Sequence, residues 1–191
     1  VLTITADAAG YTKSAITVNG VNTGALTNTG GGTYTTSYTV AEGNTDRGAG
    51  TTPISVVLSD AAGNTNTAFT SVSYAGTLTI DANTPTITSA TVSGGTAKVG
   101  TQITLTVVAD AAGYTCSACT LNGVAVTGFS DDGGGTYTMT YTVAEGNTDR
   151  GAGATPVSIV LDDGENTNNA HTTLVESSAQ TIDANSPAAT T

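Results

Sequence analysis

The sequence predicts an all-β protein of two tandem antiparallel β-sandwich domains, the first lacking its opening strand. The first observation is an internal repeat, because the run YTVAEGNTDRGAG occupies residues 38–50 and returns 103 residues later at 141–153. The second is composition: threonine and valine favour half-buried strands, whereas the 24 glycines and the asparagines favour turns. The third is spacing, since short alternating segments with turn signals every 8–12 residues or so are typical of a sandwich.

The repeat also predicts the domain boundaries. We expect the first sandwich over residues 1–80, an acidic linker over 81–85, a complete second sandwich over 86–182, and a further linker with the start of a following strand over 183–191. The segment TIDAN recurs at 79–83 and 181–185, so the second copy has lost one residue before this point. Domains of about a hundred residues can bury a modest core without a disulfide or a metal.

The first half of the complete domain reads as three strands. Residues 86–92 alternate apolar and polar side chains after a proline, which predicts an opening strand A. A turn is expected at 98–100, and strand B follows with Ile103, Leu105 and Val107 on one face. A small-residue loop is expected over 110–117, with strand C entered at 120–121.

The second half begins with Asn122-Gly123, the strongest short hairpin signal in the chain. The later elements are expected in this order: a return strand over 124–129, a turn over 131–135, strand E with Tyr137, Met139 and Tyr141 at period two, a polar loop over 144–155, strand F over 156–161, a turn over 162–169, and strand G over 172–182. No segment has a helical period.

The first domain differs at its start. Residues 1–6 correspond to strand B of the second copy, so strand A is missing, while residues 186–191 resemble the beginning of another strand A. One explanation is that these residues were cut from a longer protein. The other is that the tail of one subunit completes the sheet of the next, as in donor-strand fibres, because an unpaired sheet edge is an aggregation hazard.

Several motifs resemble those of bacterial and archaeal immunoglobulin-like repeats. These are SDAAGN at 59–64, TIDANTP at 79–85 and GGGTYTTSYTVAEGNTD at 30–46, the last being similar to repeats of giant adhesins and archaeal surface-layer proteins. The second copy departs from the pattern, with DDGEN at 162–166. The resemblance implies two tandem immunoglobulin-like domains and an extracellular role as a stalk, lattice or spacer, with neighbouring repeats or copies of the same protein as partners.

The net charge of the chain limits the classes of partner that it can bind. A formal net charge of -11 repels nucleic acid and anionic lipid and attracts cations. No apolar run approaches the roughly 20 residues of a membrane span, and no signal peptide is present, so a surface protein would carry its anchor elsewhere. We therefore expect an extracellular, cell-surface location without membrane insertion of this segment.

Recurring acids predict a cation at the domain junction. Alternate loops of a sandwich lie at opposite poles, so the repeated loop and linker of the first domain should face the turns of the second. Ca²⁺ takes about six to eight oxygen ligands, mostly from carboxylates, amides and carbonyls. The expected junction ligands are Glu42, Asn44, Asp46, Asp81, Asn83, Asp110, Asp162, Asp163 and Glu165, and Glu145, Asp149 and Asp183 form an equivalent half-site.

Two alternatives stay open, one to the cation site and one to the structural role. These acids are ordinary turn residues, so they are solvated loop groups if no metal binds, with Arg47 paired to one of them. The other concerns function: a glycan- or protein-binding module would act through loop aromatics, for which Tyr11 and Tyr114 are the repeated candidates.

The remaining reactive residues predict a disulfide and no catalysis. Cys116 and Cys119 are expected to form a disulfide in an oxidising exterior, with two free thiols as the alternative. Zinc is not expected, because the single His171, aligned with Ala68 of the first copy, has no obvious partner ligand. Asp131-Asp132 is absent from the first copy and reads as a solvated turn, so we do not expect an enzyme.

Overall fold

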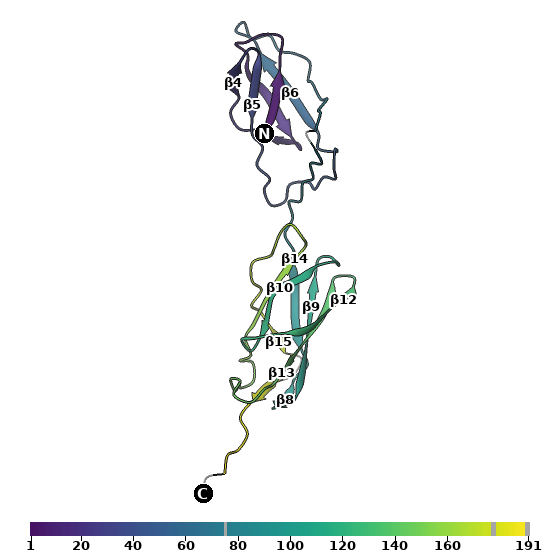
Figure 1. The fold of residues 1–191 in the computed structure, drawn as a ribbon, viewed down its shortest axis with the longest axis vertical. Coiled ribbons are helices and arrows are strands. Elements are labelled where there is room, and N and C mark those ends of the chain that lie inside the picture. Colours follow the sequence, from purple (N-terminus) through teal and green to yellow (C-terminus); the bar gives the residue numbers. More distant parts are fainter. Residues whose placement is uncertain (75, 177–178, 190–191) are drawn as a thin grey trace. The chain divides into compact units, whose positions relative to one another are not determined.

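The computed structural model describes residues 1–74, 76–176 and 179–189, and this part of the chain contains strands and no helix. The prediction of an all-β fold is therefore confirmed. The chain divides into two compact units, Val1–Asn83 and Thr84–Thr191. Within each unit the strands form several sheets, as expected for a β-sandwich (Figure 1).

The second unit contains a five-stranded sheet in the order β12-β13-β9-β7-β15. Its central strand β9 pairs antiparallel with β13, where Leu105 lies opposite Met139, and antiparallel with β7 on the other side. The strands are β7 (Ile87–Val92), β9 (Gln102–Ala109), β12 (Thr127–Gly133), β13 (Thr136–Thr142) and β15 (Val175–Glu176).

A second sheet of this unit has the order β11-β10-β14, and β16 and β8 form a two-stranded sheet. The strands are β8 (Gly95–Lys98), β10 (Thr115–Leu121), β11 (Val124–Ala125), β14 (Val157–Asp162) and β16 (Gln180–Asp183). One apolar core joins Leu105, Val107 and Met139 of the large sheet with Leu121 and Ile159 of the other. All five side chains have no exposed surface, so the expected period-two faces are confirmed.

The first unit has two three-stranded sheets, in the orders β1-β5-β4 and β3-β2-β6. The register repeats that of the second unit, because Ile4 lies opposite Tyr34 as Val107 lies opposite Tyr137. The strands are β1 (Leu2–Thr5), β2 (Thr12–Val18), β3 (Val21–Asn22), β4 (Thr27–Gly30), β5 (Thr33–Thr36) and β6 (Ile54–Ser59).

The closing segment of the second unit differs from the expected strand G. The prediction of a continuous strand over 172–182 is wrong, because β15 and β16 are separate elements; residues 177–178, within that prediction, lie outside the described residues. Both strands pair in parallel, β15 with β7 and β16 with β8, so the unit is not purely antiparallel. Strand β8 was not predicted, since Gly-Thr-Ala-Lys carries little apolar alternation.

Three boundaries also moved. The expected loop over 110–117 is shorter, because β10 already begins at Thr115, which pairs with Asp162. The return strand over 124–129 is divided between β11 and β12, which belong to different sheets. Residues 131–133, expected in a turn, complete β12, with a register shift between Asp131 and Gly133.

The residue lost from the second copy lies in the turn after β14. Val56 bridges Phe69 in the first unit, and Ile159 bridges His171 in the second. His171 therefore corresponds to Phe69, and its alignment with Ala68 was wrong. The four residues after Asp60 are shortened to three after Asp163, which produces the shift.

A tyrosine hydroxyl ties the turn after the first core strand in both units. The Tyr34 hydroxyl donates to the Ala8 carbonyl and accepts from the Tyr11 amide at 3.0 Å, and Tyr137 repeats this with Ala111 and Tyr114. The neighbouring glycine is sterically required: Gly135 has a φ of 78°, and a Cβ there would collide with the Ala109 carbonyl oxygen.

We expect Gly135→Ala to destabilise the second unit by about 3 kcal/mol, because a strained positive φ and an overpacked contact each cost about 1–3 kcal/mol. The matched control Gly134→Ala also has a positive φ, 61°, but open space around it, and should cost only about 1 kcal/mol. Urea unfolding followed at the methyl group of Met139, the only methionine, would report on this unit alone. Equal losses in both variants would contradict the collision.

Candidate functional site

The repeated loop, residues 38–50 and 141–153, is organised around a buried asparagine. Asn19 is 5% exposed and has a φ of 55°, and Asn122 is 4% exposed with a φ of 56°. Both belong to the Asn-Gly turns, where asparagine and glycine tolerate this conformation. The predicted hairpin at Asn122-Gly123 is thus present, with a further role for its asparagine.

The asparagine side chain binds the loop through three groups. In the second unit its amide nitrogen donates to the Thr148 carbonyl at 2.8 Å and to the Tyr141 hydroxyl at 3.2 Å. Its oxygen accepts from Arg150 Nε at 2.7 Å. The first unit makes the same three bonds, and there Arg47 Nε donates to the side-chain oxygen of Asn19.

The loop in turn holds the segment that leaves the unit, which we name the exit segment and define as residues 80–83 and 182–186. Asp149 Oδ1 accepts from the Ala184 amide at 2.7 Å and from the Asn185 side-chain nitrogen at 2.9 Å. Asp46 Oδ1 makes the equivalent bonds with Ala82 and Asn83, both at 2.8 Å. The contact is therefore a repeated feature of the chain.

Backbone bonds and burial complete this contact in both units. The Arg150 amide and carbonyl each bond to Ile182 at 2.9 Å, and Arg47 bonds to Ile80 in the same way. Ala82 is 5% exposed and Ala184 is fully buried. In the second unit the Ser186 hydroxyl also donates to Glu145 at 2.7 Å. We name this set of contacts the exit clamp.

Hydrogen bonds lower the pKa values of the clamp acids. The pKa of Asp149 lies below its ordinary value mainly because the Ala184 amide donates to it, and that of Asp46 mainly because the Ala82 amide does so. The Ser186 hydroxyl lowers the pKa of Glu145, while the nearby charge of Asp149 acts in the opposite direction. The clamp acids are thus charged at neutral pH.

A second group of acids lies in the turns of the second unit. Asp110 Oδ1 accepts from the Thr86 amide at 2.9 Å and from the Tyr114 hydroxyl at 3.1 Å. Burial, followed by Asp110 and more weakly Asp163, raises the pKa of Tyr114 to about 12. Asp110 and Asp163 therefore both lie near the end of the second unit at which the chain enters it, at Thr86.

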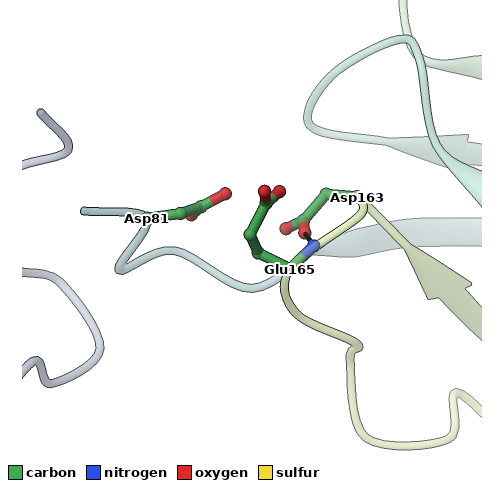
Figure 2. Close-up of side chains that lie close together, drawn as sticks. All are labelled: Asp81, Asp163 and Glu165. Carbon is green, nitrogen blue, oxygen red and sulfur yellow. Dashed lines mark hydrogen bonds between the residues drawn. The ribbon is translucent and has the colours of Figure 1, made fainter. Parts of the chain in front are cut away.

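The turn after β14 carries the remaining acids of this unit. Asp163 Oδ1 accepts from the Glu165 amide at 2.9 Å (Figure 2). It also accepts from the Asn166 amide at 2.7 Å. Asp162 closes the same turn by accepting from the Gly164 amide. These turn bonds fix the backbone, and the Glu165 side chain is exposed.

The expected ligands thus separate into different roles. Asn44 Oδ1 already accepts from the Tyr38 hydroxyl and the Ala41 amide, so the loop uses this oxygen. Asp81 and Asp183 accept long bonds of 3.3 Å from the asparagine two residues later. In the described part of the second unit, Glu145, Asp149 and Asp183 do not all lie within 4.8 Å of one another. Glu42 lies in the exposed part of the repeated loop.

Sequence reasoning missed the roles of two residues, Asn122, which holds the repeated loop, and Ser186, which belongs to the exit clamp. The recurrence of Asn-Gly at 19–20 and 122–123 was a usable signal, but its role depends on a long-range contact with the loop.

The cysteines lie within strand β10. Cys116 and Cys119 are joined by a disulfide, with a register shift in the β10–β14 pairing between Cys116 and Ala118. In the first unit Lys13 replaces Cys116, and its ammonium donates to the Thr23 and Gly24 carbonyls. The disulfide is therefore particular to one unit.

The loop aromatics and the paired acids have intramolecular partners. Tyr114 is half-buried, and its ring centroid lies 6.2 Å from that of Tyr137, while the Tyr11 hydroxyl donates to Asp7. Asp131 accepts from the Gly113 and Gly133 amides, and Asp132 accepts from Ser130. These groups stabilise turns.

No protein-family model, curated protein or solved structure matches this chain. Within the described residues, no helix has the length and apolar character needed to cross a membrane.

We expect Asp149→Ala to free the exit segment of the second unit, because the Ala184 amide would lose its acceptor. Hydrogen exchange at Ala184 should accelerate by about tenfold or more. The control Glu165→Ala removes an acid at the turn after β14 and should leave Ala184 protected. Unchanged exchange in Asp149→Ala would show that the backbone bonds to Ile182 suffice.

Acidification should release the same segment. Because folding lowers the pKa of Asp149 below its ordinary value of 3.8, its contribution is present above that value and is lost as the pH falls through the lowered pKa. Exchange-sensitive spectra of Ala184 and Ser186 from about pH 6 to about pH 2 should show the loss near the acidic limit. Asp149→Asn should flatten this dependence for Ala184, and an identical profile would contradict it.

Proposed function

We propose that this chain is a pair of structural repeats from an extracellular prokaryotic surface assembly, namely a surface-layer lattice, a filament or an adhesin stalk. The observation that carries the proposal is the exit clamp, because the same loop sequence holds the departing chain in both units. A clamp at this position restricts the first residues of the linker. Restricting each linker is what an array needs in order to transmit force and direction from one repeat to the next.

The immunoglobulin-like class is part of this proposal. Its support is the SDAAGN motif of the first copy, the TIDAN segment that recurs in both copies and, in the second unit, two sheets around one core. The closing strands β15 and β16 return in parallel beside the opening strands β7 and β8, which places the chain ends at the margins of the sheets.

We further propose that Ca²⁺ stiffens the linker between the units, with Asp81 as one of its ligands. The chain itself supports this, because Asp81 stands five residues before Thr86, whose amide is bonded to Asp110. The turn acids of the second unit act at this entry point. Hard cations prefer such carboxylate oxygens, and the formal net charge of -11 favours their binding.

The binding-module alternative has less support. Tyr11 and Tyr114 are half-buried against Tyr34 and Tyr137, and their hydroxyls donate to Asp7 and Asp110. Both rings are therefore parts of the turn structure, and little of them remains for stacking on a sugar.

Calcium should raise the melting temperature and restrict motion between the units. Binding only to the folded state adds RT ln(1 + [Ca²⁺]/Kd), or about 2.7 kcal/mol at a hundredfold excess over Kd. Thermal melting and small-angle scattering with Ca²⁺ or EDTA would measure both effects. Asp81→Ala should abolish them.

Asp132→Ala is the matched control, because it removes an exposed acid that accepts a hydrogen bond from Ser130. It should preserve the calcium response. A response that is absent in the unmodified chain, or equal in Asp81→Ala, would remove the junction ion from the proposal and leave the clamp as the stiffening element.

A further inference from the structure

Strands β2 and β10 share an irregularity, a β-bulge close to their first residues. The pairing of β2 with β6 shifts between Lys13 and Ala15, and the pairing of β10 with β14 shifts between Cys116 and Ala118. The extra residue is a serine in both strands. Because a bulge disrupts the hydrogen-bonded ladder locally, the sheet holds the residues before it less firmly than the rest of the strand.

In the first unit a lysine fastens the bulge to the neighbouring segment. The Lys13 ammonium donates to the Thr23 and Gly24 carbonyls, and to the Thr23 hydroxyl at 3.2 Å. The Thr23 amide in turn donates to the Ile16 carbonyl of β2 at 3.0 Å. The bulge of the first unit is therefore held by polar contacts that a reducing agent does not affect.

In the second unit a disulfide takes the place of this lysine. Cys116 corresponds to Lys13, Cys119 corresponds to Ile16, and the segment that the lysine binds corresponds to residues 126–127. The Val126 amide still donates to the Cys119 carbonyl, at 3.1 Å, so this segment keeps its place beside β10. The Cys116 sulfur is bonded to Cys119 rather than to that segment, so the disulfide is the attachment that spans the bulge.

The two cysteines differ in their surroundings. Cys119 is 5% exposed and belongs to the same apolar core as Leu121 and Ile159, and its sulfur lies 3.7 Å from the Val160 carbonyl oxygen. Cys116 is only half-buried and packs against that core from outside. The rate of thiol–disulfide exchange depends on which sulfur an incoming thiol can reach. Cys116 is therefore the site of attack, and Cys119 is the leaving group.

We propose that Cys116 is a modification site for small thiols, and that its disulfide makes the bulge of the second unit sensitive to reduction. A thiolate attacks the Cys116 sulfur and forms a mixed disulfide with it. The Cys116–Cys119 bond breaks, its electron pair goes to the Cys119 sulfur, and that sulfur takes a proton from water. This proposal goes beyond the array function and does not depend on it.

A second small thiol completes the reduction. Its thiolate attacks the sulfur of the first thiol, and the bond to Cys116 breaks with its electron pair on the Cys116 sulfur, which is then protonated. The two small thiols leave as one disulfide. Two thiols are thus oxidised while the disulfide of the chain is reduced to two cysteine thiols.

Reduction should release the beginning of β10. Thr115 and Cys116 pair with Asp162 and Leu161, and the bulge separates these pairs from the rest of the strand. The Thr115 hydroxyl reaches the Asp162 carbonyl only at 3.5 Å, so this side chain adds little to the pairing. The equivalent residues of the first unit stay fastened by Lys13. A reducing medium therefore loosens one repeat and leaves the other unchanged.

The first test is the reaction of the complete chain with glutathione in large excess, quenched with acid. Fragment mass spectrometry should find the adduct on Cys116 and a free thiol on Cys119. The rate of reduction by dithiothreitol should change less than about twofold in urea below the unfolding transition, because the folded unit reacts. The site is overturned if no adduct forms, if the adduct lies on Cys119, or if the rate rises in parallel with the unfolded fraction.

Hydrogen exchange tests the consequence of reduction. After treatment with dithiothreitol, the amides of residues 115–118 and of their partners in β14 should exchange at least about tenfold faster. Those of β9 and β13, and those of β2 in the first unit, should keep their rates. Equal protection before and after reduction would show that the disulfide does not hold the bulge.

Two variants separate the contact across the bulge from the loss of the cysteines. Cys116→Lys with Cys119→Ile copies the residues of the first unit, whereas Cys116→Ser with Cys119→Ile has the same core side chain and no lysine. The first variant should keep the slow exchange of the oxidised chain, with or without dithiothreitol. The second should exchange about tenfold faster at residues 115–118, as the reduced chain does. Equal rates in the two variants would contradict the equivalence of lysine and disulfide, and reduction of the unmodified chain decides the proposal if either variant fails to fold.

Discussion

The path of the repeated loop depends on one buried amide in each unit. Asn19 and Asn122 are buried, and an unsatisfied buried polar group costs about 1–3 kcal/mol. The loop meets this requirement with a backbone carbonyl, a tyrosine hydroxyl and an arginine nitrogen. Once Thr45 and Arg47 are held, Asp46 between them faces the exit segment. The identical sequence of the two loops therefore encodes one hydrogen-bonded unit.

The sequence predicted those features that depend on local pattern. The alternation around Leu105 and Met139, the Asn-Gly hairpins and the all-β class all have short-range causes. Strands β8, β15 and β16 have none, because their pairing joins segments about 85 residues apart in Gly- and Thr-rich stretches. The strand-G prediction failed there, since parallel pairing to two short strands leaves no continuous alternating pattern.

The sequence predicted which residues belong to the candidate site better than it predicted what each residue does there. The recurrence of Asp46 and Asp149 identified important acids, but sequence does not show which oxygen is already occupied. Asn44 illustrates the difference, because the Tyr38 hydroxyl and the Ala41 amide take its oxygen. A loop asparagine thus resembles a metal ligand in sequence while acting as an internal brace.

Both acidic groups, the clamp acids and the turn acids, keep a negative charge that a cation could neutralise. Clamp acids such as Asp149 are stabilised by neutral donors, which favour the charged form and leave the negative charge in place. Turn acids such as Asp163 also accept their hydrogen bonds from neutral amides. The hydrogen bonds therefore order the carboxylates without cancelling their repulsion, and only a positive charge can do that. The exit clamp orders the backbone and the carboxylates of the linker, whereas a cation would cancel the repulsion between those carboxylates. Stiffening by one therefore does not replace stiffening by the other.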